Sequence, residues 1–173
     1  MSTNGVPSGR QRRLHALVVP FPAQGHLLPL LDFAHRLSTR HGFRLTVAVT
    51  PSNLPLISAF LVSTPLATTL PIPLPDTSSP EHSRQLPPGT HHALLAVHLS
   101  GIRAPLLSWA WSHPDPPTVV ISDFFLGWTQ LLADGMRVPR VAFYGVGATS
   151  GIRSCLSLSP VHRLSRTSTC RRW

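Results

Sequence analysis

The chain has 173 residues, of which 42% are hydrophobic and 12% charged, so it is long enough for one folded domain and too apolar to be disordered throughout. All 15 basic residues are arginine. The absence of lysine excludes P-loop nucleotide hydrolysis and Schiff-base chemistry, because both need a lysine side chain.

The formal net charge of +9 is concentrated at the two ends of the chain. Residues 1–13 and 153–173 together contain eight arginines and no acidic residue, whereas residues 14–152 contain seven arginines and six acidic residues. We therefore expect a flexible basic arm over 1–13, a domain over 14–152 and an irregular basic tail over 153–173. Basic residues concentrated at the two ends of a chain are typical of solvated tails, so we expect no nucleic-acid partner.

Cysteine and histidine do not occur in metal-binding patterns. The two cysteines form no C-x-x-C pair, and the ten histidines are scattered without an H-E-x-x-H motif. We therefore expect neither a disulfide framework nor a metal site. Pro20 and Pro22 interrupt the first apolar run, which favours a buried strand over a signal peptide. No apolar stretch approaches the roughly 18 residues that span a membrane, so we expect a cytoplasmic protein.

The first elements in chain order are a strand, a helix and a second strand. Residues 15–20 are apolar and end in proline, which predicts a buried strand. Residues 26–40 carry leucines at helical spacing, with Pro29 in the first turn and Gly42 as the stop signal. Residues 43–50 alternate and are rich in valine and threonine, which predicts the second strand.

The next segment is less regular. Residues 52–61 predict a short helix with Ser52 as its cap, and residues 68–72 predict a short third strand. Six prolines fall within 71–88, which indicates a long extended loop.

The remaining elements continue an alternation of helices and strands. Residues 91–112 predict a helix that Pro105 should kink or split, followed by a buried strand over 118–123, a short helix over 126–136 and a strand over 140–145. This alternation predicts an α/β fold, a Rossmann-like parallel sheet with flanking helices.

Two residues point to a site at the carboxyl ends of the strands, where ligands bind in such sheets. In a sheet of order 3-2-1-4-5 the first and fourth strands are neighbours, which would bring His26, at a helix start, close to Asp123, at a strand end. A helix start carries partial positive charge, so His26 would be available as a neutral base, with Asp123 holding its tautomer. Alternatively, each residue only caps the helix that follows it.

Two segments resemble a known family. VVPFPAQGHLLPLLDFAHRL (18–37) and PPTVVISDFFLGWTQLLADGMRVPRVAFY (116–144) resemble, in the same order, segments of plant small-molecule UDP-glycosyltransferases, with the flavonol and phenolic branch the most similar. The resemblance covers residues 14–147 and implies the amino-terminal, acceptor-binding half of a GT-B fold. It implies inverting sugar transfer without a metal or other cofactor: His26 deprotonates a phenolic hydroxyl, Asp123 is its partner, and a UDP-sugar, expected to be UDP-glucose, is the co-substrate.

The resemblance also implies acceptor-binding residues, for most of which ordinary core packing is the alternative. They are Phe21, Gln24, Gly25, Phe124, Phe125, Trp128 and Tyr144.

The chain departs from the family in what it lacks. The UDP-sugar-binding domain, with its H-C-G-W-N-S core, is absent from the sequence, and Gly145 stands where many members have serine or threonine. We therefore expect a truncated chain that is inactive alone and exposes apolar surface for self-association. The alternative is a non-catalytic module that binds phenols. A dinucleotide oxidoreductase would need G-x-G-x-x-G after the first strand, and a serine hydrolase G-x-S-x-G; neither motif is present.

Overall fold

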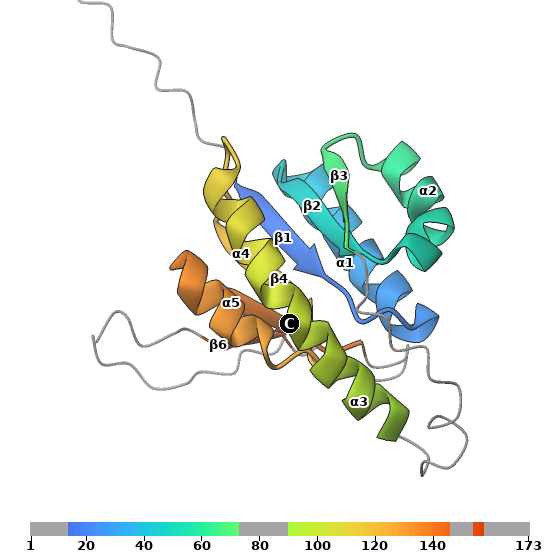
Figure 1. Ribbon diagram of the computed structural model, residues 1–173. Coiled ribbons are helices and arrows are strands. Elements are labelled where there is room, and N and C mark those ends of the chain that lie inside the picture. Colours follow the sequence, from blue (N-terminus) through green and yellow to red (C-terminus); the bar gives the residue numbers. More distant parts are fainter. Residues whose placement is uncertain (1–13, 73–89, 146–153, 158–173) are drawn as a thin grey trace, which may run out of the picture.

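The computed structural model describes residues 14–72, 90–145 and 154–157 (Figure 1). The expected basic arm, nearly all of the proline-rich loop and most of the expected tail lie outside these residues.

The described residues form a six-stranded sheet with the order β3-β2-β1-β4-β5-β6 (Figure 1). Strands β1 to β5 pair in parallel with one another, and β6 pairs antiparallel with β5. The predicted parallel sheet is therefore confirmed, and its first five strands have the order 3-2-1-4-5 that was considered above. The strands are β1 (His15–Val19), β2 (Arg44–Val49), β3 (Ala67–Pro71), β4 (Val119–Asp123), β5 (Arg140–Phe143) and β6 (Ser154–Ser157).

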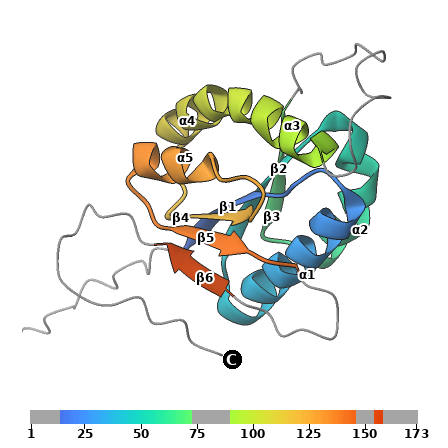
Figure 2. The same ribbon diagram turned by 90° about the horizontal axis from the view of Figure 1, so that it is seen from below.

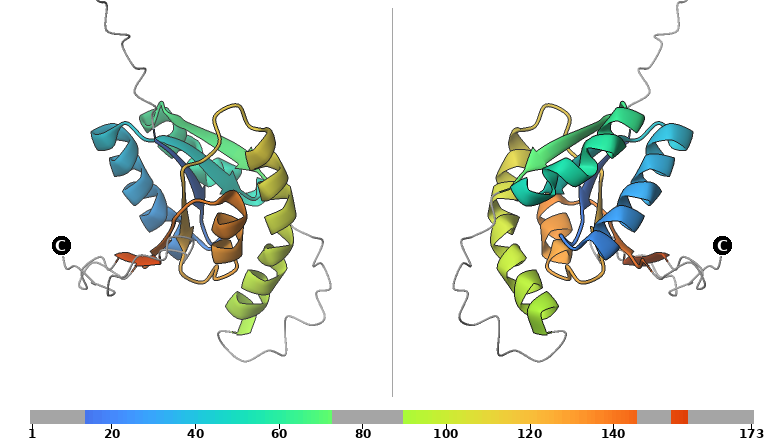
Figure 3. Two further views of the ribbon diagram at one scale, coloured as in Figure 1. Left: turned by 90° about the vertical axis from the view of Figure 1, so that its left-hand side faces the viewer. Right: turned by 90° about the vertical axis from the view of Figure 1, so that its right-hand side faces the viewer.

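Helices cover both faces of the sheet (Figures 2 and 3). Helices α1 (Gln24–His41) and α2 (Leu54–Ser63) lie on one face, and α3 (Thr90–Leu99), α4 (Arg103–Ser112) and α5 (Thr129–Met136) lie on the other. Alternate residues of β1 enter the two cores: Ala16 and Val18 pack on the α1 side, and Leu17 and Val19 pack on the α3 side. Burial on both faces explains why β1 reads as a continuous apolar run.

Helix α1 begins two residues earlier than the sequence predicts. Its N-cap residue is Ala23, so Pro29 lies inside the helix rather than in its first turn. Proline has no N–H, so the Gly25 carbonyl does not receive its usual helical hydrogen bond. The predicted stop is confirmed: Gly42 has a φ of 69°, and its N–H donates to the Ser38 carbonyl at 2.9 Å.

The predicted split of the helical segment over 91–112 is also confirmed. The break is a 3-10 turn over Ser100–Ile102, and Pro105 is the third residue of α4, where its missing N–H needs no helical partner. Two other helix starts were predicted wrongly. The N-cap of α2 is Asn53 rather than Ser52, because a 3-10 turn over Pro51–Asn53 precedes it. Helix α5 begins at Thr129 rather than at 126, because turns follow β4.

Strand β6 is a correction to the expected irregular tail. Four residues of that segment pair antiparallel with β5, with Arg140 opposite Ser157 and Phe143 opposite Ser154. Pairing of this kind is made by backbone groups and extends the sheet beyond β5, so it leaves little signature in side-chain patterning.

A buried histidine joins segments at the amino ends of the strands. Nδ1 of His15 lies 2.7 Å from the Asp115 carbonyl oxygen, and Nε2 lies 2.9 Å from Thr46 Oγ1. A carbonyl only accepts, so Nδ1 donates and the Thr46 hydroxyl donates to Nε2. Burial lowers the pKa of His15 below its ordinary 6.5, with smaller lowering effects of Arg44 and His113, against opposing effects of Asp115.

We expect His15 to lower the free energy of unfolding in mild acid. Since the pKa of His15 is lower in the folded chain than in the unfolded chain, its contribution is complete above about pH 6.5 and is lost as pH falls toward the folded pKa. The slope is at most about 1.4 kcal/mol per pH unit for one proton. Urea unfolding between about pH 7.5 and about pH 5.5 should show a steeper loss for the natural chain than for His15→Asn. Parallel curves would contradict this expectation.

Candidate functional site

The candidate site lies where β1 and β4 end side by side. These strands pair in parallel, with Val18 opposite Ile121 and Val19 opposite Ser122. The loop that leads from β1 into α1 and the turn that follows β4 therefore begin at the same edge of the sheet. This is the edge at which parallel α/β sheets bind ligands.

The structure brings His26 and Asp123 into contact. Nδ1 of His26 lies 2.9 Å from Oδ2 of Asp123. The carboxylate is 1% exposed, whereas the imidazole, in the first turn of α1, is 23% exposed. The second carboxylate oxygen, Oδ1, accepts the backbone N–H of Phe125 at 2.9 Å. The juxtaposition predicted from strand order is thus present.

The alternative in which each residue only caps a helix does not describe these contacts. Helix α1 has Ala23 as its N-cap, and α5 starts at Thr129, beyond the turn that Asp123 supports. The carboxylate instead binds the imidazole with one oxygen and the turn with the other.

The contact determines which nitrogen of His26 carries the proton. An ionised carboxylate only accepts hydrogen bonds, so Nδ1 is the donor, and in the neutral ring Nε2 then holds the lone pair. A positioned imidazole of this kind, with a buried carboxylate behind it, has the chemistry of a general base for a hydroxyl group.

Aromatic rings surround the imidazole. The ring centre of His26 lies 5.3 Å from that of Phe21, 5.8 Å from Phe124 and 5.1 Å from Phe125. Phe124 also stacks on Tyr144, with centroids 4.9 Å apart and an interplanar angle of 16°. Phe21 is fully buried, whereas Phe125 is 40% exposed and Tyr144 is partly exposed. Three of the sequence-predicted residues therefore contact His26, Phe21 among them from within the core, and Tyr144 joins the group through Phe124.

Two further predicted residues lie on the surface at the start of α1. Gln24 and Gly25 are both exposed, and a Cβ added at Gly25 would meet nothing within 4 Å. The position therefore has no steric need for glycine among the described residues.

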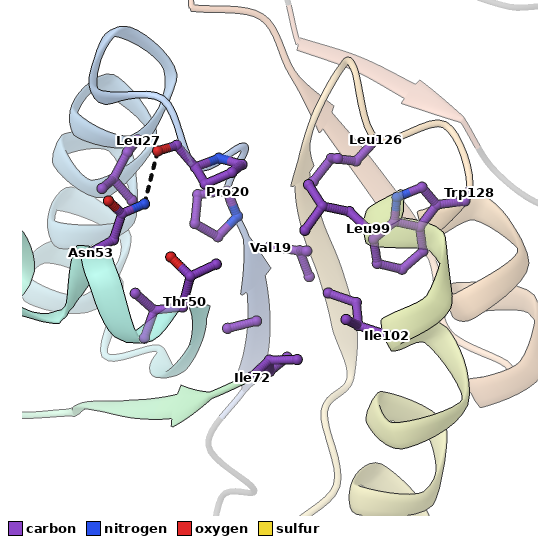
Figure 4. Close-up of a pocket in the computed structure, with 13 residues that line it drawn as sticks. Val19, Pro20, Leu27, Thr50, Asn53, Ile72, Leu99, Ile102, Leu126 and Trp128 are labelled. Carbon is purple, nitrogen blue, oxygen red and sulfur yellow. Dashed lines mark hydrogen bonds between the residues drawn. The ribbon is translucent and has the colours of Figure 1, made fainter. Parts of the chain in front are cut away.

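A mostly apolar pocket opens at the same edge of the sheet, on the side of α3 (Figure 4). Of the predicted site residues, only Trp128 lines it. Its walls are formed by Val19, Pro20, Pro22, Leu27, Ala48, Val49, Thr50, Asn53, Ile72, Leu99, Ile102, Leu126 and Trp128.

The pocket adjoins the His26–Asp123 pair without including it. Pro22 and Leu27 flank His26 in the chain, and Leu126 lies in the turn that starts at Asp123. The pocket and the pair therefore share two supporting segments at this edge of the sheet.

Several pocket residues were not predicted from the sequence. Thr50 and Ile72 follow β2 and β3, so their position after a strand was the available signal. Asn53 Nδ2 donates to the Pro22 carbonyl at 2.8 Å and so ties the segment after β2 to the loop after β1 (Figure 4). No local pattern in the sequence predicts that contact.

Trp128 carries a polar group without a described partner. Its Nε1 is buried, and no hydrogen-bond acceptor for it is found among the described residues. A buried N–H without an acceptor is costly, and indole nitrogens usually find one.

The described part of the chain offers neither a metal-binding cluster nor a membrane-spanning helix. Within residues 14–72, 90–145 and 154–157, no three histidine, cysteine or acidic side chains are grouped so that they could hold a metal ion. None of the helices in those ranges is long and apolar enough to cross a membrane.

Sequence comparison finds relatives among plant enzymes. The chain is 43% identical over 142 residues to flavonol 3-O-glucosyltransferase UGT89B1 of Arabidopsis thaliana, a match that covers 79% of this chain and 29% of that enzyme. It is 39% identical over 173 residues to UDP-glycosyltransferase 89A2 of the same plant, covering 92% of this chain and 37% of that protein. No protein-family model matches the chain.

Solved structures agree with the sequence comparison. The crystal structure of Arabidopsis thaliana UGT89C1 complexed with UDP-L-rhamnose has a TM-score of 0.67 and 31% identity, covering 76% of this chain and 36% of that one. The same protein complexed with quercetin gives a TM-score of 0.67, 31% identity and coverage of 76% and 35%. The chain spans about a third of the length of these relatives. Sequence and fold thus agree that the chain belongs to the plant UDP-glycosyltransferases, as a segment of about a third of a member's length.

Proposed function

We propose that this chain is the acceptor-binding part of a UDP-glycosyltransferase. The enzyme transfers a sugar, which we expect to be glucose, from a UDP-sugar to a hydroxyl group of a flavonol or another phenol. The observation that carries the proposal is the 2.9 Å contact between His26 Nδ1 and Asp123 Oδ2 beside an apolar pocket. The 43% identity to a flavonol 3-O-glucosyltransferase supports the choice of reaction and acceptor.

The proposed transfer is a single displacement. His26 Nε2 takes the proton of the acceptor hydroxyl while its oxygen attacks the anomeric carbon of the UDP-sugar. The new carbon–oxygen bond forms as the bond from that carbon to the phosphate oxygen breaks, and UDP leaves with the electron pair. Because attack comes from the face opposite UDP, the configuration at the anomeric carbon inverts. The Asp123 carboxylate stabilises the imidazolium formed.

Planar aromatic acceptors suit the surroundings of the pair. The pocket walls are predominantly aliphatic, and two exposed rings offer flat surfaces: Phe125 next to His26, and Tyr144 against Phe124. Aromatic faces favour stacking with a planar phenol. The second candidate function, binding of phenols without transfer, rests on the same pocket.

The proposal is tested with two proteins, because the chain spans 29% of its relative UGT89B1. The first is the chain itself, in which calorimetry measures quercetin binding. The second is a chimera in which residues 14–145 replace the matching segment of UGT89B1, assayed with UDP-glucose and quercetin. Binding by both and transfer by the chimera are expected. A folded chimera that binds quercetin but transfers nothing would favour the non-catalytic alternative, and absence of binding in both would refute the proposal.

Trp128→Phe should weaken quercetin binding about three- to tenfold, because a ligand oxygen would lose the indole N–H as its donor. The aromatic ring is retained, so packing against the pocket changes little. Trp111→Phe is the matched control, since Trp111 is 71% exposed on α4, outside the pocket. Calorimetric titration of both variants measures the difference. Equal affinities in the two variants would show that the Trp128 N–H does not contact the ligand.

The cytoplasmic location and the self-association expected from the sequence stay predictions.

A further inference from the structure

A buried arginine lies beneath the turn that follows β4. Arg140, the first residue of β5, is 7% exposed. Its Nε donates to Ser122 Oγ at 3.0 Å, and its Nη2 donates to the carbonyl oxygens of Leu126 at 3.3 Å and of Asp123 at 3.4 Å. One guanidinium therefore bridges the end of β4 and the turn beyond it.

Two hydroxyl groups extend this network. Thr129 Oγ1 donates to the Leu126 carbonyl at 2.6 Å, and Ser122 Oγ lies 2.7 Å from Thr129 Oγ1. Because Thr129 uses its hydrogen on that carbonyl, Ser122 is the donor to Thr129 and the acceptor from Arg140. Hydrogen bonds thus run in one direction from Arg140 through the Ser122 and Thr129 hydroxyl groups to the turn, and each of these two hydroxyl groups both donates and accepts.

The network and the catalytic candidates lie on opposite faces of the sheet end. Val120 packs in the core on the α5 side, and Ile121 packs in the core on the α1 side. By strand alternation, Ser122 points with Val120 toward α5, and Asp123 points with Ile121 toward α1, where it meets His26. Arg140 stands opposite Val120 in the register of β4 and β5, and its guanidinium donates to Ser122 on the α5 face.

The charge of Arg140 also bears on Asp123. Burial lowers the pKa of the Arg140 guanidinium, and the nearby Tyr144 and Asp123 act in the opposite direction. The direct acceptors of the guanidinium in the described structure are two carbonyls and a hydroxyl, all neutral. Asp123 is the buried carboxylate in its neighbourhood, so each charge compensates part of the cost of burying the other.

We infer that Arg140 is a positioning residue for the His26–Asp123 pair. It holds the turn after β4 from the α5 face, so that the Asp123 carboxylate faces His26 Nδ1 on the α1 face. Arg140 therefore determines the tautomer of His26, and this inference rests on the proposed role of the pair as base and partner. Loss of the guanidinium releases the turn, and the proton of the neutral imidazole is then free to move to Nε2, which removes the lone pair that a hydroxyl needs.

Nitrogen-15 NMR of the ring nitrogens of His26 in the full chain, above the titration of histidine, tests the inference. The ratio of the Nδ1–H to the Nε2–H tautomer should fall about tenfold in Arg140→Met, the order expected for one charge-assisted hydrogen bond. Arg140→Lys keeps the charge without the planar fork, and Ser122→Ala removes one acceptor only, so both should give smaller falls. Arg36→Met is the control, because Arg36 is exposed and pairs with Asp32 on the surface of α1.

The outcomes separate this inference from the proposed function. A folded Arg140→Met with the natural tautomer ratio would overturn the positioning role. Should that variant fail to fold, an unchanged ratio in both Arg140→Lys and Ser122→Ala would overturn it equally. If the natural chain itself lacks the Nδ1–H tautomer, the proposed function fails at the pair. A fall in the three variants, with none in Arg36→Met, supports the inference.

Discussion

Replacing His26 by alanine is expected to lower kcat/KM for sugar transfer by about 10²–10⁴-fold in the chimera with UGT89B1, the usual contribution of a positioned general base. The imidazole is in contact with a buried carboxylate and is itself partly exposed, so it has both an orienting partner and access to a hydroxyl. Asp123→Ala should cause a loss of similar order, because the ring then has no acceptor that holds its tautomer.

The matched control for this experiment is His41→Ala. His41 is exposed at the opposite end of α1, so the substitution removes an imidazole from the same helix without touching the pair. Initial rates with UDP-glucose and quercetin give kcat/KM for all variants, and quercetin affinity checks that the pocket is intact. A His26→Ala chimera that retains the activity of the His41→Ala chimera would exclude His26 as the base.

Phe21→Ala should destabilise the chain by about 3–5 kcal/mol, the usual effect of deleting a buried phenylalanine ring. Phe21 is 0% exposed and packs in the core on the α3 side, while its ring also lies against His26 and Phe125. The resemblance implied that Phe21 contacts the acceptor. Because the residue is buried, we expect it instead to support the His26 imidazole from within the core.

Phe125→Ala is the matched control, since its ring is 40% exposed and contacts the same imidazole. Its loss should cost about 1 kcal/mol, in the range of one aromatic pair. Urea unfolding of both variants measures the difference, and calorimetry with quercetin shows which ring also serves binding. Equal destabilisation by the two substitutions would contradict the assignment of Phe21 to the core.

Apolar runs and helical spacing were sufficient to predict the five parallel strands, whereas their order in the sheet was only assumed. β1 and β4 are buried on both faces, and such strands appear in a sequence as short continuous apolar segments. Helix starts were less predictable. Pro29 lies inside α1 because this helix begins at Gln24, and Ser52 does not cap α2 because a 3-10 turn over Pro51–Asn53 precedes that helix.

The sequence by itself determined the α/β fold and the placement of His26 after one strand and of Asp123 at the end of another. Only the tertiary structure decided that these side chains meet at 2.9 Å. It also decided that Asn53 donates to the Pro22 carbonyl and that Arg140 holds the turn after β4 from the α5 face. The physical reason is that local patterns depend on neighbours along the chain. Contacts across a sheet depend on strand register and on the face to which each side chain points, and these are settled only when all strands pack together.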